Sequence, residues 1–239
     1  MDTLHLSQEG RKIIAHRGCS GLEMENTASA FVAAANRSYF GIETDVHKTA
    51  DGKYIIVHDD NTKRVAGDEM IVEKTTYETL RSLHLVNADG ERDRGDLIMP
   101  NLREYIRICK KYGKKSVLEL KNHFKPADID EIIAIIRQEG WLEQVIFISF
   151  DLPNMLCIRE KLPEQEAQFL ISDFPEWLPE TLKANRLDLD IKYTALTKER
   201  VEMLKKDGIR INVWTVNDPE EANKLLGWGV DYVTSNILE

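Results

Sequence analysis

Three acidic residues have the type and spacing to bind a metal ion. Glu43 and Asp45 lie two residues apart in the expected strand 41–46, so both side chains point to the same side of it. Glu119 has a similar place in the next long strand, and an acid inside an apolar strand is costly to bury without a partner. Three carboxylates at neighbouring strand ends suit Mg²⁺ or Ca²⁺. A metal-free ion pair between Glu119 and Lys121 is the alternative interpretation.

An expected hairpin brings a histidine toward these acids. Residues 54–59 form a second strand-like run, and too few residues precede it for a parallel crossover, so it must fold back antiparallel. With Asp51-Gly52 as a two-residue turn, counting outward places His58 opposite Asp45. The spacing of Glu43 and Asp45 alone favours ordinary surface acids. The hairpin weakens that interpretation.

The first expected strand ends in His16-Arg17, which adds an imidazole and a guanidinium to the same edge. The planar guanidinium of Arg matches the oxygens of a phosphate. A single His-Arg pair is weak evidence, but it stands with His58, Lys121 and three acids at the ends of consecutive strands. His47 is one residue out of phase with Glu43 and Asp45, so we expect it at the surface.

The elements that must position these residues alternate between short β-branched runs and amphipathic helical stretches. The expected strands are 12–17, 41–46, 116–121, 145–150, 167–171, 187–193, 209–216 and 231–235. The expected helices are 27–37, 102–112, 126–139, 152–161, 175–185, 198–206 and 219–226. This series predicts an α/β fold of the (β/α)₈ TIM-barrel class. A doubly wound sheet is the rival, but no Gly-x-Gly-x-x-Gly turn follows the first strand.

We expect one domain over residues 1–239, because no Pro/Gly/Ser-rich linker interrupts the series. Residues 61–99 depart from the alternation and predict a small insertion after the second strand and its hairpin arm. We expect one short helix there, at 76–83.

Composition narrows the class of partner. The chain has 239 residues, 42% of them hydrophobic, and a formal net charge of -9, so no overall positive field favours nucleic acid. Its three cysteines lie far apart, which indicates free thiols in a reducing compartment. No run approaches the length of a membrane span, and the first twelve residues contain no signal-peptide pattern. We therefore expect a cytoplasmic protein, unless a signal peptide has been removed, and the oligomeric state stays open.

An ordered series of short motifs resembles the glycerophosphodiester phosphodiesterase family. The series is His16-Arg17-Gly18, Glu25-Asn26-Thr27, Glu43-x-Asp45, His58-Asp59, Pro100-x-Leu102-x-Glu104, Glu119-x-Lys121, Ser149-Phe150 and Trp214-Thr215-x-Asn217. It runs in order from about residue 12 to 235, which is far more specific than any one motif. The resemblance implies a phosphatidylinositol phospholipase C-like TIM barrel with a small insertion after the His58 arm.

The resemblance also implies roles for individual residues. It assigns the metal to Glu43, Asp45 and Glu119, and acid and base catalysis to His16 and His58. It places around the phosphate and glycerol the side chains of Arg17, Glu25, Asn26 and Lys121. Trp214 is expected to form an apolar wall, and we add Phe150 because it ends a strand. Met24 stands where the family often has Pro, and Thr234-Ser235-Asn236 replaces a common Thr-Asp; we expect neither to touch the chemistry.

The implied activity is metal-dependent hydrolysis of a small glycerophosphodiester to sn-glycerol 3-phosphate and an alcohol. Two histidines that titrate near neutrality suit an acid and base relay, with the glycerol 2-hydroxyl as nucleophile. Cleavage of lysophospholipids by a phospholipase D-type reaction is one alternative, and a non-catalytic phosphate-ligand-binding barrel is another. The preferred alcohol, the choice between Mg²⁺ and Ca²⁺, and the assignment of acid and base stay open.

Overall fold

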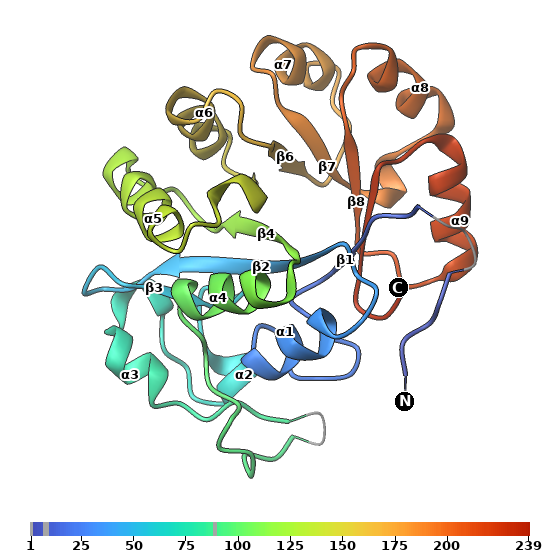
Figure 1. The fold of residues 1–239 in the computed structure, drawn as a ribbon. Coiled ribbons are helices and arrows are strands. Elements are labelled where there is room, and N and C mark those ends of the chain that lie inside the picture. The colour runs from blue at the N-terminus through green and yellow to red at the C-terminus, as the bar shows by residue number, and fades with distance from the viewer. Residues whose placement is uncertain (1, 7–9, 88–89) are drawn as a thin grey trace.

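A closed barrel of eight parallel strands forms the centre of the structure, a computed structural model that describes residues 2–6, 10–87 and 90–239 (Figure 1). Neighbouring strands follow the order β1-β9-β8-β7-β6-β5-β4-β2, and β1 also pairs with β2, which closes the ring. The strands are β1 (Ile13–Ala15), β2 (Gly41–Lys48), β4 (Lys115–Leu120), β5 (Val145–Ser149), β6 (Ala167–Ile171), β7 (Asp188–Lys192), β8 (Ile211–Trp214) and β9 (Tyr232–Ser235). The predicted TIM barrel is confirmed, because a doubly wound sheet would leave two open edges.

Helices surround the barrel and connect its strands (Figure 1). They are α1 (Ala28–Ala35), α4 (Leu102–Tyr112), α5 (Pro126–Gln138), α6 (Leu152–Lys161), α7 (Leu178–Ala184), α8 (Lys198–Lys206) and α9 (Pro219–Trp228). Short 3₁₀ turns, η2 (Leu142–Gln144) and η3 (Tyr193–Ala195), adjoin β5 and β7. The ends of α4 illustrate the local code, since Asn101 and Glu104 form a reciprocal capping box and Gly113, at φ 68°, ends the helix.

The alternation along each strand divides the core into two layers. One face of the strands packs against the helices and contributes most of the buried apolar residues. The other face fills the inside of the barrel with a smaller apolar cluster of Ile14, Val117, Ile146, Ile148, Leu170 and Tyr232. Buried polar side chains share this inner face, and Glu43, Asp45 and Glu119 among them belong to the site described below.

The antiparallel arm is present, but its register differs by one residue from the predicted one. Strand β3 (Tyr54–Ile56) pairs with β2 so that Val46 faces Ile56, which places Val57, not His58, opposite Asp45. The turn contains three residues between Thr49 and Lys53, with Gly52 at φ 75°. The Thr49 hydroxyl explains the longer turn, because it accepts the Lys53 N–H at 2.9 Å and closes the loop one residue earlier.

The segment after β3 folds over the edge of the barrel and carries three short helical elements (Figure 1). They are α2 (Lys63–Ala66), the 3₁₀ turn η1 (Val72–Lys74) and α3 (Tyr77–Arg81). The single helix expected at 76–83 is therefore shorter than predicted and has two companions. We call this segment, residues 57–99, the insertion. Its apolar cluster includes Val65, Ala66, Val72, Leu80, Leu85, Leu97 and Met99, against which Met24 packs.

The prediction that His47 lies at the surface is wrong. His47 points away from Glu43 and Asp45, as the strand period requires, but its side chain is fully buried. The insertion covers that face, and η1 places Glu73 3.6 Å from His47 Nδ1. The insertion itself was predicted, but not its packing over this face of β2, which buries the side chain of His47.

Candidate functional site

A cavity of about 100 Å³ opens at the carboxyl ends of the barrel strands. It is lined by His16, Arg17, Glu43, His58, Glu119, Ile148, Phe150, Leu170, Asp190, Trp214, Thr215 and Thr234. Seven of the eleven predicted site residues are therefore among its lining residues. The other four each contact a lining residue: Glu25, Asn26 and Asp45 contact Arg17, and Lys121 contacts Glu119.

Glu43, Asp45 and Glu119, which we call the acidic cluster, are brought together as predicted. One carboxylate oxygen from each lies within 4.8 Å of the others, and none of the three residues is more than 6% exposed. Burial and then the charge of Asp45 raise the pKa of Glu43, and burial raises the pKa of Glu119 to about 7. Asp45 Oδ1 is buried without a hydrogen-bond partner. Three converging carboxylates with an unused buried oxygen fit a hard divalent cation.

Two cations stand beside the acidic cluster. Lys121 Nζ lies 2.8 Å from Glu119 Oε1 and 3.6 Å from Asp45 Oδ1, so the predicted ion pair exists next to the three converging carboxylates. Arg17 Nε lies 3.6 Å from Asp45 Oδ2. Burial alone would raise the pKa of Asp45, but these two cations reverse that effect and hold it well below its ordinary value.

The turn after β1 aims Arg17 at this site. Arg17 adopts φ 54°, a left-handed conformation that is uncommon for a residue with a side chain, and its N–H donates to Glu43 Oε2 at 2.8 Å. Gly18 follows at φ 79°, where an added Cβ would lie 2.7 Å from the backbone of Ala30. The chain can therefore turn this sharply against α1 only with glycine at position 18.

Asn26 supports the acidic cluster from behind. Its Nδ2 donates to Asp45 Oδ2 at 2.8 Å, and its Oδ1 accepts from Thr44 Oγ1 at 2.7 Å. Asn26 is 3% exposed and does not line the cavity. The described contacts of Asn26 thus orient Asp45.

His16 reaches the cavity with one ring nitrogen already engaged. Its Nδ1 is 2.7 Å from Asn236 Oδ1, which also accepts from Ser20 Oγ at 2.9 Å. Burial and the charge of Arg17 lower the pKa of His16 to about 4. Two expectations are therefore wrong: His16 does not titrate near neutrality in this environment, and Asn236 does touch a proposed catalytic group.

His58 approaches the cavity from the segment after β3. Its Nδ1 is 2.7 Å from Asp59 Oδ1, a contact that fixes the ring and leaves Nε2 free. Burial lowers the pKa of His58, Lys121 and Arg17 act in the same direction, and Asp45 and Asp59 oppose them. The register of the hairpin differs from the predicted one, yet His58 lies at the cavity because regular pairing ends at Ile56.

Two aromatic residues form one wall of the cavity. The rings of Phe150 and Trp214 meet edge to face, with centroids 5.7 Å apart, and both residues line the cavity as predicted. Phe150 is 46% exposed, so its ring is also part of the outer rim. Leu170 and Ile148 continue the apolar side.

Sequence reasoning missed several residues of the site, among them Asp59, Asn236 and Asp190. Asp59 and Asn236 each hold one histidine, and the signal for Asp59 was its place directly after His58. Asp190 lines the cavity at 2% exposure, its Oδ1 has no hydrogen-bond partner, and burial raises its pKa. It occupies an inward position of an expected strand, so the strand period could have found it.

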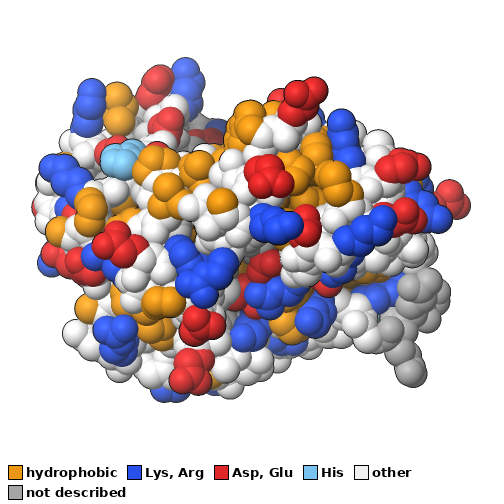
Figure 2. All heavy atoms as spheres, turned by 90° about the horizontal axis from the view of Figure 1, so that it is seen from above, with side chains coloured by type: hydrophobic (Ala, Val, Ile, Leu, Met, Phe, Trp, Pro, Cys, Tyr) orange, Lys and Arg blue, Asp and Glu red, His pale blue; other side chains and the backbone are white. Residues whose placement is uncertain are grey.

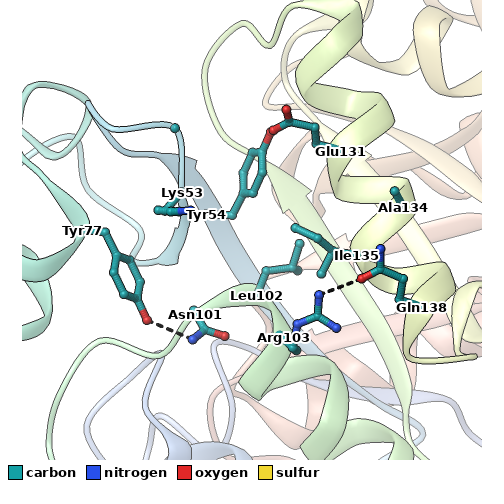
Figure 3. Close-up of a pocket in the computed structure, with 11 residues that line it drawn as sticks. Lys53, Tyr54, Tyr77, Asn101, Leu102, Arg103, Glu131, Ala134, Ile135 and Gln138 are labelled. Atoms are coloured by element: carbon teal, nitrogen blue, oxygen red, sulfur yellow. Dashed lines mark hydrogen bonds between the residues drawn. The ribbon is translucent and has the colours of Figure 1, made fainter.

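A larger hollow of about 530 Å³ lies outside the barrel, between the β2–β3 hairpin, α4 and α5 (Figure 3). Asn101 Nδ2 donates to Tyr77 Oη there at 2.9 Å, and Arg103 Nη2 donates to Gln138 Oε1 at 2.9 Å (Figure 3). Tyr54 Oη donates to Glu131. These polar groups pair with one another, whereas those of the barrel cavity converge on a common space.

Charges of both signs are mixed on the face of the molecule that Figure 2 shows. Figure 2 shows Lys and Arg side chains interspersed with Asp and Glu across one face, without a broad area of one sign. Across residues 2–6, 10–87 and 90–239, every helix is too short or too polar to cross a bilayer.

Comparison with known proteins agrees with this geometry. The Bacillus subtilis protein YhdW is 32% identical over 231 residues, which cover 94% of this chain and 93% of its own. A glycerophosphodiester phosphodiesterase of Bacillus altitudinis is 30% identical, with 95% of this chain and 94% of that protein covered. A phosphodiesterase of Oleispira antarctica, solved in complex with the product sn-glycerol-3-phosphate, superposes with a TM-score of 0.88 at 27% identity, over 95% of this chain and 93% of that one. The sequence profile of the glycerophosphoryl diester phosphodiesterase family matches residues 16–238, so the chain belongs to that family and is an enzyme.

Proposed function

We propose that this enzyme hydrolyses small glycerophosphodiesters to sn-glycerol 3-phosphate and an alcohol, with a divalent metal and two histidines. The observation that carries the proposal is the convergence of His16, His58 and the acidic cluster on one cavity, each histidine held through its Nδ1. The Oleispira antarctica relative was solved with sn-glycerol-3-phosphate as product, which supports the same product here.

Glu43, Asp45 and Glu119 would hold the metal, Mg²⁺ or Ca²⁺. When bound, a divalent ion polarises a phosphoryl oxygen and offsets the charge of the three carboxylates. Arg17 and Lys121 stand at the edge of the same site, where their positive charge favours the phosphodiester anion. Their ion pairs with the acidic cluster orient both cations before substrate arrives.

His58 is the better candidate for the base. The Asp59 carboxylate accepts its Nδ1–H and stabilises the positive ring that forms when Nε2 takes a proton. The glycerol 2-hydroxyl gives that proton to His58, its oxygen forms a bond to phosphorus, and the bond from phosphorus to the alcohol oxygen breaks. Holding the hydroxyl beside the phosphorus makes this step intramolecular, with the high effective concentration that follows.

His16 is the better candidate for the acid. Its partner Asn236 is neutral, and the pKa of His16 is lowered to about 4. A protonated His16 therefore gives up its proton readily to the departing alcohol oxygen. The negative charge of the bound diester raises the proton affinity of the ring before the reaction. Water then opens the cyclic phosphate, which restores the 2-hydroxyl and yields sn-glycerol 3-phosphate.

The surroundings favour small diesters over lysophospholipids. The cavity has a volume of about 100 Å³. Next to His58, the insertion presents the charged side chains of Asp59 and Arg64, which form an ion pair. The apolar residues of the insertion are gathered in its own cluster. A long apolar groove leading from the site, which an acyl chain would need, is not formed by these described residues.

The direct test is release of sn-glycerol 3-phosphate from glycerophosphocholine and glycerophosphoethanolamine, with EDTA and with added Mg²⁺ or Ca²⁺. We expect metal-dependent release that His16→Ala and His58→Ala abolish while calorimetry still detects metal binding. Glu43→Ala should weaken metal binding itself. His84→Ala, at an exposed position of the insertion, is the matched control. No release by folded protein with either metal would contradict the proposal, and equal metal loss in all three site variants would contradict the division of roles.

A further inference from the structure

Arg64, on helix α2 of the insertion, binds the carboxylate that holds His58. Its Nε lies 2.7 Å from Asp59 Oδ2 and its Nη2 lies 3.2 Å from Asp59 Oδ1. The second of these oxygens is the one that His58 Nδ1 contacts at 2.7 Å. A bidentate guanidinium fixes both the position and the plane of a carboxylate. The orientation of the His58 ring therefore depends on Arg64 through one intervening side chain.

The same guanidinium also binds the carboxylate that holds Arg17. Arg64 Nη1 donates to Glu25 Oε2 at 2.8 Å, and Nη2 donates to Glu25 Oε1 at 2.8 Å. Glu25 Oε1 also accepts from Arg17 Nη1 at 2.9 Å. Arg64 thus stands at the centre of a chain of contacts that begins at the proposed base and ends at the proposed phosphate ligand.

The charges along this chain reinforce one another. The contacts with Arg64 and then with His58 lower the pKa of Asp59 to about 2 against the effect of burial, and those with Arg64 and Arg17 lower the pKa of Glu25 in the same way. Both carboxylates are mostly shielded, with side chains 26% and 17% exposed, whereas Arg64 is 48% exposed. Without Arg64, Asp59 would keep only His58 and Glu25 would keep only Arg17 from this set.

The insertion fixes the position of Arg64 by packing its neighbours. Val65 and Ala66 are buried in the insertion's apolar cluster, at 3% and 0% exposure. Val86 N–H donates to Val65 O at 2.9 Å, which ties the short helix to the returning chain. A helix of this length has little stability by itself, so tertiary packing must hold the guanidinium in place.

We propose that Arg64 is a positioning residue, through which the insertion sets the orientation of His58 and Arg17 together. This inference rests on the proposed function, because it assigns the two groups their roles in turnover. It gives helix α2 a part in the reaction, although no residue of α2 lines the cavity.

The test compares Arg64→Met, Arg64→Lys and Lys63→Met. Lys63 is the control because it neighbours Arg64 on α2, and among the described residues its side chain pairs only with Glu69, at 3.4 Å, with both side chains more than 60% exposed. We expect Arg64→Met to lower kcat/KM roughly 10- to 100-fold, as loss of a supporting contact commonly does. Both kcat and KM should change, because the side chains of His58 and Arg17 both lose the orientation that Arg64 maintains. Arg64→Lys should retain only part of the kcat/KM that Arg64→Met loses, because an ammonium group lacks the planar fork that binds two carboxylates.

Double variants separate the two arms. If Arg64 acts on His58 through Asp59, then Arg64→Met should lower kcat much less in an Asp59→Asn background than alone. If it acts on Arg17 through Glu25, then Arg64→Met should raise KM much less in a Glu25→Gln background. Additive effects in both backgrounds would overturn the proposal.

A third readout distinguishes this inference from the proposed function. Binding of sn-glycerol 3-phosphate, measured by calorimetry, should weaken at least about 5-fold in Arg64→Met but not in Lys63→Met, and millimolar guanidinium should restore part of it. Binding unchanged within twofold in Arg64→Met, or an equal loss in both variants, would overturn the inference. Absence of turnover in the unaltered enzyme would instead contradict the proposed function while this titration still decides the role of Arg64. Equal melting temperatures of the two variants would show that misfolding is not the cause.

Discussion

Two clusters of buried polar side chains inside the barrel differ in how they meet the cost of burying polar atoms. On the β2 and β4 side lies the acidic cluster, with like charges facing each other and an oxygen without a hydrogen bond. On the β6, β8 and β9 side lie Gln168, Asn212 and Thr234, which we call the amide cluster. Both are shielded from solvent, so each polar atom there must find a partner or cost free energy.

The polar groups of the amide cluster pair mainly with one another, and Gln168 Nε2 also donates to Glu166 Oε1 outside the cluster at 3.4 Å. Asn212 Nδ2 donates to Gln168 Oε1 at 3.2 Å, and Thr234 Oγ1 donates to Asn212 Oδ1 at 3.1 Å. Neutral donors and acceptors that pair internally stabilise the barrel and leave little capacity for a ligand. The acidic cluster has a net negative charge and a carboxylate oxygen without a hydrogen-bond partner, so it opposes folding and leaves capacity for a ligand. The contrast indicates that polarity inside a barrel marks a binding site only where it is left unbalanced.

The largest effect should come from removing one charge of the acidic cluster. We expect Glu119→Gln to lower kcat/KM roughly 10²- to 10³-fold, because a neutral amide is a poor ligand for a divalent cation. The same change should raise the melting temperature of the metal-free protein at pH 8. Folding raises the pKa of Glu119 from 4.5 to about 7, so its ionised form opposes folding.

The sign of this effect depends on pH. A carboxyl group with a raised pKa favours the folded state below about 4.5 and loses that contribution as the pH rises through 7. The melting-temperature advantage of Glu119→Gln in EDTA should therefore be largest at pH 8 and disappear toward pH 5. Glu164→Gln, at a side chain 91% exposed, should show no such trend and serves as the control. A variant that melts lower than the unaltered protein at pH 8 would show that the cluster is already balanced by its cations.

A smaller effect should follow from metal addition. A cation that binds only the folded chain raises its stability by about 2.7 kcal/mol at a hundred times its dissociation constant. Differential scanning calorimetry of the unaltered protein should show a rise in melting temperature with Mg²⁺ or Ca²⁺, and Glu43→Gln should lose most of it. An equal rise in both proteins would place the binding outside the acidic cluster.

The amide cluster should respond in stability and not in catalysis. Asn212→Leu removes the donor to Gln168 Oε1 and the acceptor of the Thr234 hydroxyl, which costs about 1–3 kcal/mol for each unsatisfied group. We expect chemical denaturation to show that loss, while kcat of the folded variant changes less than twofold. A loss of activity larger than the loss of folded protein would mean that this cluster takes part in the reaction.

The sequence was sufficient for the parts that depend on strand alternation. Glu43, Asp45 and Glu119 were placed on one face by a period of two, and the barrel then brought their strands together. Helix α4 matched its predicted bounds because both of its ends carry strong capping residues. These features depend on local rules that hold in any surroundings.

The errors arose where a single side-chain contact or the packing of another segment decides the outcome. The hairpin register depends on the Thr49 hydroxyl, whose contact with the Lys53 N–H competes with the two-residue turn. His47 is buried because the insertion happens to cover it, and Arg64 reaches Glu25 from 39 positions along the chain. Long-range side-chain contacts leave no periodic trace in a sequence, which is why Asn236, 220 positions from His16, was missed. Asp59 directly follows His58, so its position in the sequence could have identified it.

The smallest expected effect concerns Asp59, a carboxylate whose partners are complete. Arg64 and His58 hold the pKa of Asp59 at about 2, below its ordinary 3.8 and against the effect of burial. A lowered pKa stabilises the folded state above about pH 4, and that contribution is lost as the pH falls toward 2. Asp59→Asn should therefore lower the melting temperature at pH 7 by no more than about 2–4 °C, since partly exposed ion pairs contribute below about 1 kcal/mol. The difference should narrow below pH 4, opposite in sign to the trend for Glu119. A gap that widens on acidification would show that Asp59 is as unbalanced as the acidic cluster.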